Sequence, residues 1–259
     1  MAMDETVTYT RLGTNGRLAN QLFQIAATIA YAIDNNKAFG FPTWEYSKWM
    51  QQPLPIIPDR NYTFYREPHF HYAPIPAIPG SVDLFGHFQS EKYFAHRRKE
   101  VLPYLTINFQ RSNYIMQKYY RINRFAKTCS IHVRRTDYDT EVNRDYHGIM
   151  PIDYYEAAAK AIYGDDLTEV TFVICSDDIP FCRQFLKFPN MFFVEGEQNI
   201  IDLFLMRYCE DNIIANSSFG WWSAWLNSNQ DKKVVCHKKW FNNAPHNSKD
   251  VACENWIVL

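Results

Sequence analysis

The second half of the chain alternates short apolar runs with longer amphipathic stretches. Five runs rich in β-branched residues follow one another from Lys127 onward, namely CSIHV, VTFVIC, MFFV, NIIA and KVVC. Runs that are largely apolar are typical of parallel strands covered on both faces. Segments with helical spacing separate them, and the first begins at Pro151, a residue type favoured at the first helical position. The pattern predicts a doubly wound parallel sheet, an α/β domain whose ligand lies outside the carboxyl ends of its strands.

The first half has a weaker version of the same rhythm. A strand is predicted over residues 6–11, followed by a glycine turn and then by a helix that begins near Leu18. A second strand is predicted within residues 37–41. Residues 42–79 contain eight of the 13 prolines and many aromatic side chains, which predicts extended surface loops. Those aromatic residues either pack on one another or form a surface on which sugars stack. Two further helices are predicted, over residues 90–102 and 108–125.

Composition and charge narrow the class of protein. With 259 residues, 47% of them hydrophobic, the chain can bury one large core or two smaller ones. The 27 basic and 28 acidic residues nearly cancel, so we expect no nucleic-acid partner. No apolar run is long enough to span a membrane, the N-terminus has no signal-peptide core, and the six cysteines include no CxxC pair. We therefore expect a cytoplasmic protein with unpaired cysteines, and the chain could be one domain of a longer protein.

Polar side chains gather where three of the predicted strands end. They are His132, Arg134, Arg135, Asp137 and Glu141 after the first strand, Ser176, Asp177 and Asp178 after the second, and Asn216, Ser217 and Ser218 after the fourth. Ser217 and Ser218 open a helix, and the N–H groups and dipole at a helix N-terminus favour a phosphate. Arg134 or Arg135 could bind the same phosphate in bidentate fashion. Separately, the serines could be helix caps and the arginines surface charge. Together, at one edge of one sheet, they predict a two-sided pyrophosphate clamp.

The acidic residues have competing interpretations. Asp177 and Asp178 could bind a metal ion, whereas Asp178 could instead cap the helix that follows it. Because two arginines already supply positive charge, we expect no divalent metal and no other cofactor. Asp202 lies in the apolar run IIDLFLM and either has a local partner or accepts two hydrogen bonds from a guanine edge. His69 and His71 are interpreted as structural residues.

Five segments carry a resemblance to a known family. They are GRLANQLFQ (16–24), HVRRTDY (132–138), CSDD (175–178), DLFLMRYC (202–209) and ANSSFGWWSAWL (215–226). In this order they resemble the inverting α-1,2-fucosyltransferases of glycosyltransferase family 11, in a wider clan with the α-1,6- and protein O-fucosyltransferases. The resemblance implies an α/β, GT-B-like fold in which two Rossmann-type halves face each other across a cleft. Residues 1–126 would form the acceptor-side half, and residues 127–259 the half that binds the GDP-sugar.

The resemblance also implies a donor, an acceptor and site residues. GDP-L-fucose would be the donor substrate and a glycan the acceptor, with no metal. By position, Arg134 and Arg135 would hold the β-phosphate, and His132 and Asp202 would bracket the guanine. Ser217, Ser218 and Phe219 would cradle the pyrophosphate, and Asp177 would lie near the ribose or the fucose. Asn20 would face the reacting centre from the first half, and the other donor-binding residues would be Gly16, Arg17, Ser176 and Asn216. The chain departs from the family pattern at Ala19, Gly220 and Ser223, where one small residue replaces another.

The chemistry of glycosyl transfer agrees with these roles. Charge moves onto the leaving diphosphate as an oxocarbenium-like state forms, and fixed arginines stabilise that charge. Glu141, Asp137 or Asp139, or an assisted water, could take the proton of the acceptor hydroxyl, and no base is needed if departure of the diphosphate runs far ahead of attack. One displacement converts the β-linkage of the donor to an α-linkage, and transfer to O-2 of a galactose rests on the resemblance alone. The alternative is a non-catalytic module that binds a nucleotide-sugar or a glycan. Release of GDP only when a galactoside is added would separate the two hypotheses.

Overall fold

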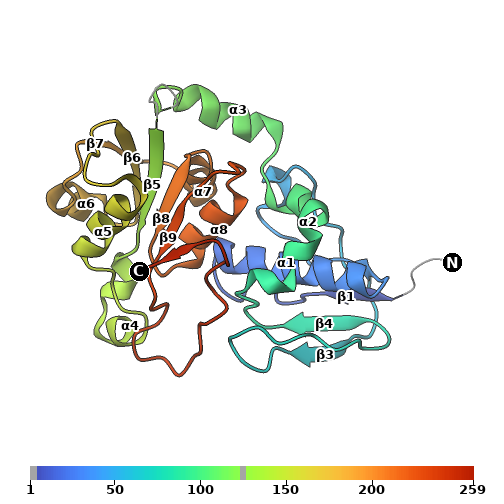
Figure 1. Cartoon of the computed structure of the whole chain (residues 1–259). Helices are drawn as coiled ribbons and strands as arrows, with labels where there is room; N and C mark the ends of the chain where they lie inside the picture. Colours follow the sequence, from blue (N-terminus) through green and yellow to red (C-terminus); the bar gives the residue numbers. More distant parts are fainter. Residues whose placement is uncertain (1–4, 123–126) are drawn as a thin grey trace. The chain divides into compact units, whose positions relative to one another are not determined.

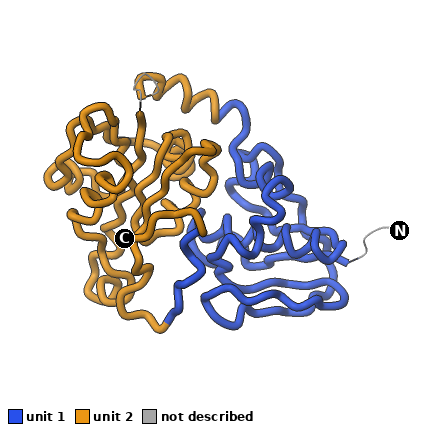
Figure 2. The backbone as a smooth tube through the Cα atoms, viewed as in Figure 1, with its two compact units in different colours: residues 1–111, 246–253 blue, residues 112–245, 254–259 orange. Residues whose placement is uncertain are grey.

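The computed structural model describes residues 5–122 and 127–259, which fall into two compact units (Figure 2). Unit 1 contains residues 1–111 and 246–253, and unit 2 contains residues 112–245 and 254–259. The predicted boundary at residue 126 falls in the segment 123–126, which lies outside the described residues. The packing changes earlier, between residues 111 and 112, and it returns residues 246–253 to unit 1.

Side-chain contacts account for this division. Helix α3 (Phe109–Lys118) crosses from one unit to the other, and the hydroxyl groups of Ser112 and Tyr208 share a hydrogen bond of 2.6 Å within unit 2. In unit 1, Asp250 accepts hydrogen bonds from Nζ of Lys92 at 2.5 Å and from the backbone N–H of Tyr72 at 3.1 Å. The late segment is therefore joined to unit 1 by a carboxylate that sequence patterns do not single out.

Unit 1 is built on a four-stranded parallel sheet with the order β2-β1-β4-β3. Its strands are β1 (Thr6–Thr8), β2 (Ala38–Phe39), β3 (Thr63–Arg66) and β4 (Val82–Phe85). Its helices are α1 (Leu18–Asp34) and α2 (Arg98–Leu105). Three 3₁₀ turns complete the unit: η1 (Ser47–Trp49) between β2 and β3, and η2 (Glu91–Tyr93) and η3 (Ala95–Arg97) before α2. The predicted first strand, first helix and second strand are confirmed. However, β3 lies inside the stretch predicted to be loop, and β4 was not predicted. Both strands are short, and their own sequence pattern does not predict a strand. Parallel pairing of β4 with β1 and of β3 with β4 stabilises them instead.

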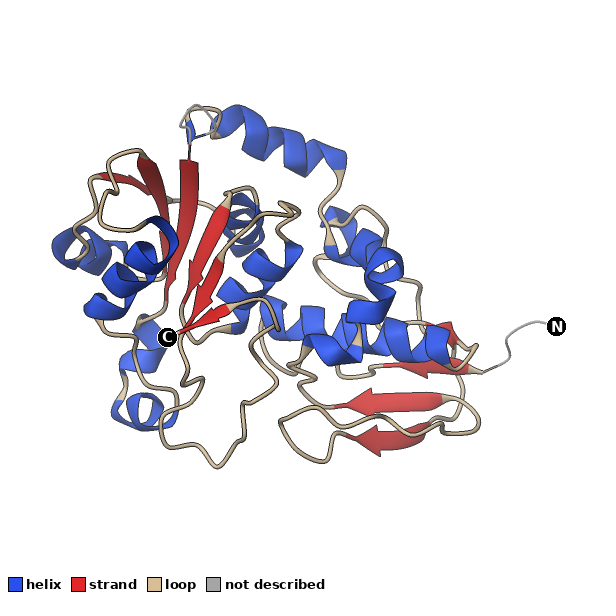
Figure 3. Cartoon of the chain, in the orientation of Figure 1, coloured by secondary structure: helices blue, strands red, loops and turns tan. Residues whose placement is uncertain are grey.

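Unit 2 contains a six-stranded parallel sheet with the order β10-β9-β8-β5-β6-β7 (Figure 3). Its strands are β5 (Lys127–Val133), β6 (Val170–Ser176), β7 (Asn190–Phe193), β8 (Asp211–Ile214), β9 (Val234–Cys236) and β10 (Ile257–Val258), and its helical elements are η5 (Thr136–Asp139), α4 (Glu141–Tyr146), α5 (Ile152–Tyr163), α6 (Ile179–Phe185), α7 (Asn199–Arg207) and α8 (Ser218–Leu226). All five predicted strands are confirmed, and β10 adds a sixth. From β5 the sheet grows first toward β7 and then in the opposite direction, as in doubly wound sheets.

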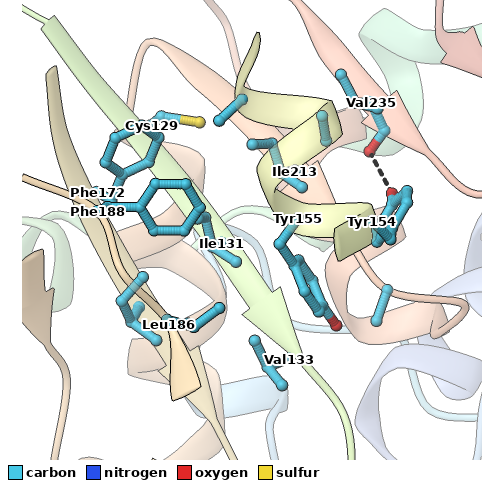
Figure 4. Packing of buried hydrophobic residues seen from close by; sticks show 14 of the residues in the cluster. Cys129, Ile131, Val133, Tyr154, Tyr155, Phe172, Leu186, Phe188, Ile213 and Val235 are labelled. Carbon is cyan, nitrogen blue, oxygen red and sulfur yellow. Dashed lines mark hydrogen bonds between the residues drawn. The ribbon is translucent and has the colours of Figure 1, made fainter. Parts of the chain in front are cut away.

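The two faces of this sheet carry different helices (Figure 1). Alternate residues of β5, including Ile131 and Val133, pack in a core with Tyr155 of α5. Figure 4 shows this core, where the hydroxyl of Tyr154 donates to the backbone carbonyl of Val235 at 3.3 Å. The intervening residues of β5 face α7 and α8. The same alternation decides, at the end of β5, which charged side chain lies on which face.

Two further observations bear on the sequence expectations. All six cysteines lie in described positions, are buried, and form no disulfide there. Within residues 5–122 and 127–259, no helix combines the length and the apolar character needed to cross a bilayer.

Candidate active site

The candidate site of unit 2 lies where two neighbouring strands send the chain to opposite faces of the sheet. β5 and β8 pair directly, with His132 aligned on Ile214. After β5 the chain continues to α5 on one face, and after β8 it continues to α8 on the other. Ligands of open α/β sheets bind at such a switch point. The polar clusters that follow the first and fourth predicted strands therefore meet at this edge.

Two carboxylates hold the guanidinium group of Arg134. Its Nη2 lies 2.6 Å from Oδ2 of Asp137, and its Nη1 lies 3.1 Å from Oδ2 of Asp177. The Tyr138 ring lies 5.6 Å from the guanidinium carbon, and the Tyr138 hydroxyl donates to the backbone carbonyl of Asn216 at 3.3 Å. The Arg134 side chain is 18% exposed. A positioned cation is thus connected to the loop between β8 and α8.

Arg135 lies on the other face of the sheet. Its guanidinium carbon is 3.5 Å from the centroid of the Phe181 ring on α6, and its Nε is 3.5 Å from Oδ2 of Asp178. Burial raises the pKa of Tyr155 in the α5 core, and the nearby charge of Arg135 partly opposes that rise. Adjacent residues at a strand end point to opposite faces. The two guanidinium groups therefore do not converge in this structure, and binding of a phosphate by either of them stays a prediction.

Asp177 organises the turn that follows β5. Its Oδ1 accepts the backbone N–H of Arg135 at 2.9 Å, and its Oδ2 accepts the hydroxyl of Thr136 at 2.7 Å. Partial burial alone would raise the pKa of Asp177, but the Thr136 hydrogen bond, the Arg134 charge and the Arg135 N–H together keep that pKa below its ordinary value. Both carboxylate oxygens are engaged by the protein. The position of Asp177 near the ribose or the fucose stays a prediction.

Ser176 and Asp178 begin helix α6. Oδ1 of Asp178 accepts the backbone N–H of Phe181 at 3.1 Å, which makes Asp178 the N-cap and confirms the structural alternative for this residue. The Ser176 hydroxyl accepts the N–H of Asp178 at 2.9 Å. In the part of the chain that the structure describes, no three or more His, Cys, Asp or Glu side chains are arranged to hold a metal ion.

His132 is buried on the α8 face of the sheet. Its ring centroid lies 5.4 Å from that of Phe219. Burial, reinforced by the charge of Arg134, lowers the pKa of His132 to about 3, so the imidazole is neutral at pH 7. Its Nδ1 has no hydrogen-bond partner among the described residues. A Cβ at Gly220 would approach Nδ1 to 2.9 Å, so α8 packs against His132 only because residue 220 has no side chain.

Asp202 lies on α7, on the same face as His132. His132 aligns with Cys175 across the β5–β6 pair, and the charge of Asp202 contributes to the raised pKa of that buried thiol. Burial, with a smaller effect from Glu197, raises the pKa of Asp202 itself to about 7. Its buried Oδ1 has no hydrogen-bond partner in the described ranges. No described group therefore fills the role of the local partner that was one of the two alternatives.

The N-terminus of α8 completes this edge. Ser217 is the N-cap, and its hydroxyl accepts the backbone N–H of Phe219 at 3.3 Å. Ser218 is half-buried in the first turn. Asn216 is 2% exposed, and its side-chain amide donates to the carbonyls of His147 at 2.7 Å and Trp240 at 3.2 Å. Asn216 and Ser217 thus have structural roles, whether or not they also contact a phosphate.

The candidate proton acceptors have different surroundings. Asp137 is paired with Arg134, whereas Glu141 is exposed at the first position of α4. Asp139 is paired with Arg144 and lies 3.4 Å from Nη2 of Arg135. Of these three candidates, Asp137 is therefore the one that lies directly against Arg134.

The candidate residues of unit 1 lie where the chain enters α1. Gly16 has a φ of 83°, and a Cβ there would approach Nδ2 of Asn20 to 2.5 Å, so this turn requires glycine. Asn20 is half-buried, and its Oδ1 accepts a hydrogen bond from the Gln89 side chain at 3.0 Å. Arg17 is the exposed N-cap residue, and Ala19 is buried in the first turn.

Three residues to which the sequence reasoning assigned no role shape the site. Thr136 and Tyr138 connect the arginine turn to Asp177 and to the β8–α8 loop, and Gly220 admits His132. A glycine inside an apolar helical run is a signal of close packing, and it could have identified Gly220. Thr136 and Tyr138 stand among charged residues and give no comparable signal.

The fold is shared with solved glycosyltransferases. NodZ, an α-1,6-fucosyltransferase from Bradyrhizobium crystallised with GDP, matches with a TM-score of 0.56 over 86% of this chain and 92% of its own, at 14% identity. At this identity the likeness establishes the fold alone. It confirms the predicted α/β, GT-B-like class with Rossmann-type units.

Residues 14–259 match the family described as Glycosyl transferase family 11, and the chain belongs to this family. The O-antigen biosynthesis glycosyltransferase WbnK of Escherichia coli is 39% identical over 186 residues, which cover 68% of this chain and 60% of WbnK. An α-1,2-colitosyltransferase of Escherichia coli is 30% identical over 190 residues, 71% of this chain and 64% of the relative. The galactoside 2-α-L-fucosyltransferase SEC1 of Bos taurus is 25% identical over 233 residues, 83% of this chain and 63% of SEC1. The chain thus spans less than two thirds of each of these relatives.

Proposed function

We propose that this protein is an inverting glycosyltransferase that moves L-fucose from GDP-β-L-fucose to O-2 of a galactoside, without a divalent metal. Membership of glycosyl transferase family 11 and the names of the fucosyltransferase relatives support this reaction. Within the structure, the observation that carries the proposal is Arg134, which Asp137 and Asp177 fix at the sheet's switch point.

In the proposed complex the donor lies across the ends of β5 and β8. Its diphosphate binds the N-terminus of α8 and Arg134, whose two ion pairs leave several of the five guanidinium N–H donors for phosphate oxygens. The guanine lies beside His132, whose imidazole is neutral at pH 7, while ionised Asp202 accepts hydrogen bonds from the N–H groups of the base. The role of Arg135 is to hold the turn through Phe181 and Asp178, so that the residue acts through Arg134.

Charge at the site favours directed donors over a general positive field. Around the turn, Arg134, Arg135 and Arg144 face four carboxylates. Binding of an anionic diphosphate would then depend on individual N–H groups and on the helix dipole. A divalent metal is not part of the proposal, because the arginine and the helix N-terminus can take up the charge of the leaving group.

In the reaction, the bond between fucose C1 and the β-phosphate oxygen breaks, and a bond forms from C1 to the acceptor oxygen on the opposite face. Arg134 stabilises the charge that collects on GDP, which is stabilisation greater in the transition state than in the ground state. The acceptor hydroxyl loses its proton to a carboxylate, for which Asp137 and Glu141 are the candidates, or to water. The buried cysteines, which form no disulfide, are consistent with the proposed cytoplasmic location.

Colitose is a second candidate for the sugar that is transferred. One relative is named an α-1,2-colitosyltransferase, and it is 30% identical to this chain, compared with 25% for SEC1. Activated colitose is therefore the alternative donor. The roles proposed for Arg134 and the α8 N-terminus are the same for either sugar, because both act on the diphosphate.

The test is a donor and acceptor screen with the purified chain. GDP-fucose or GDP-colitose is incubated with lactose and other galactosides, with and without EDTA, and GDP and the glycan product are measured by mass spectrometry. We expect acceptor-dependent release of GDP, a fucosylated product and no loss of activity in EDTA. GDP binding without product in every combination would support the non-catalytic alternative, and loss of activity in EDTA would contradict metal independence.

A further inference from the structure

Glu67 in unit 1 is a half-buried residue whose carboxylate has no basic partner in its hydrogen bonds. It follows β3, and its Oε2 accepts the backbone N–H groups of His87 at 2.7 Å and Phe88 at 3.1 Å. Its Oε1 accepts the hydroxyl of Tyr93 at 3.2 Å. Burial raises the pKa of Glu67 even though these three donors oppose the rise. Such a carboxylate acts as a fixed acceptor for the loop that follows β4.

This loop, residues 86–89, has a backbone that its own sequence does not favour. Phe88 has a φ of 50° and is fully buried, although a bulky residue rarely adopts the left-handed region. A Cβ at Gly86 would approach Cβ of Glu67 to 2.4 Å, and the Gly86 carbonyl accepts the hydroxyl of Tyr9 at 2.9 Å. Strained conformations persist when the surrounding structure over-determines them, and they concentrate at functional sites.

The loop lies at the carboxyl edge of the parallel sheet of unit 1. β4 ends at Phe85, and β3, its parallel neighbour, ends one residue before Glu67. Gln89 donates a hydrogen bond of 3.0 Å to Asn20, the residue placed at the reacting centre by the family resemblance. His87 is exposed at this edge, where open parallel sheets bind their ligands. Arg134, His132, Asp202 and the N-terminus of α8, to which the proposed function assigns the GDP moiety, belong to unit 2.

We propose that residues 86–89 form an acceptor-binding loop, in which His87 contacts the hydroxyl groups of the acceptor sugar, and that Glu67 is the positioning residue that fixes this loop. The inference rests on the proposed function and adds to it a recognition element for the acceptor. His87 can donate and accept hydrogen bonds at its two ring nitrogens, which suits a galactoside with several hydroxyl groups. Glu67 acts only through the loop backbone, because its oxygens are already engaged.

The experiment measures acceptor and donor binding separately. Galactoside binding is followed by saturation-transfer NMR in the presence of GDP, GDP binding by calorimetry, and the acceptor KM and kcat by GDP release. The variants are His87→Ala, Glu67→Gln and the control Asp34→Asn. Asp34 is also a carboxylate of unit 1, but it pairs with His96 and Arg97 at the far end of α1, about 25 Å from its N-terminus by helix rise.

We expect His87→Ala and Glu67→Gln each to weaken galactoside binding and raise the acceptor KM by about tenfold, as for one or two lost hydrogen bonds. GDP affinity should stay within about twofold, and Asp34→Asn should change neither. His87 is exposed, so its variant tests the loop even if Glu67→Gln unfolds. If the wild type transfers fucose and His87→Ala leaves acceptor binding unchanged, the inference is wrong and the proposed function stands. If the wild type binds no galactoside, both are wrong.

Discussion

The two adjacent arginines should differ sharply in their contribution to catalysis, because only Arg134 lies on the α8 face. In the proposed reaction, replacing Arg134 by alanine removes a cation from the leaving diphosphate. Loss of one such preorganised donor typically costs about 3–4 kcal/mol, so kcat should fall by about 10²–10³. Replacing Arg135 by alanine removes packing on Phe181 and a contact with Asp178, but it leaves the backbone N–H that binds Asp177. We expect its kcat to fall by less than about tenfold.

Stability measurements separate this effect from damage to the fold. Arg134→Ala leaves Asp137 and Asp177 without their cation, and Arg135→Ala exposes Phe181, so each should lower the free energy of unfolding by about 1–2 kcal/mol. Arg134→Lys keeps the charge but loses the planar fork, and it should recover only part of the activity. The assay is GDP release with saturating donor and acceptor, paired with thermal unfolding of each variant.

The result that would refute this reasoning is equal loss of kcat in the two alanine variants at similar stability. That outcome would mean that Arg135 reaches the diphosphate in the working enzyme, as the sequence alone suggests. An active Arg134→Ala variant would instead remove the structural basis of the proposed function.

Three further predictions concern the donor site. Gly220→Ala should place a methyl group 2.9 Å from Nδ1 of His132 and 3.0 Å from Cβ of Ile214, which should cost about 1–3 kcal/mol of stability and weaken GDP binding. The control Ser223→Ala loses only a hydrogen bond to the Gly220 carbonyl and should bind GDP normally. Calorimetry and thermal unfolding compare the two variants. Because the pKa of Asp202 is raised to about 7, its ionised fraction should rise from about a tenth to nine tenths between pH 6 and 8, and GDP binding should tighten by up to about ninefold. The unfolded chain ionises Asp202 at a pKa near 4, so the folded state should lose stability as the pH rises from about 4 to about 7. Asp202→Asn should abolish both trends. The near balance of charge at the arginine turn predicts that the donor KM changes by less than about threefold between 50 and 300 mM NaCl, and a steep dependence would show that a general positive field binds the donor.

The sequence was most informative for strands that are buried on both faces, because such strands appear as continuous apolar runs. Each of the five strands predicted in the second half exists, because runs such as VTFVIC are almost wholly apolar, and their one polar side chain, Thr171, is itself buried. The two-residue strand β10 and the four-residue strands β3 and β4 show no such run. Their place depends on partners far away in the chain, including Val235 for Ile257 and Ser81 and Val82 for Thr63. Local pattern cannot supply that information.

The candidate site shows a similar division between residue types and geometry. The polar clusters do meet at one edge of the sheet, as the alternation of strands and helices predicts. The orientation of each side chain was harder to infer, although strand alternation already implies that Arg134 and Arg135 diverge. The partner of each acid was also hidden, because Asp178 caps a helix while Asp202 has a buried oxygen without a described partner.

The acidic residues of the turn hold the Arg134 guanidinium group in one orientation. Asp177 and Asp137 use their oxygens on Arg134, on the Thr136 hydroxyl and on the Arg135 backbone, which restricts the rotamers of a long side chain before any ligand arrives. A cation ordered in advance loses less conformational entropy when it binds phosphate, and it need not reorganise as the leaving group gains charge. The dense RRTDYD segment is therefore best understood as one ligand-facing guanidinium group with its supports. It follows that Asp177→Asn should lower kcat mainly through Arg134, so most of the loss should vanish in an Arg134→Ala background. A loss that persists there would indicate that Asp177 contacts the donor sugar itself.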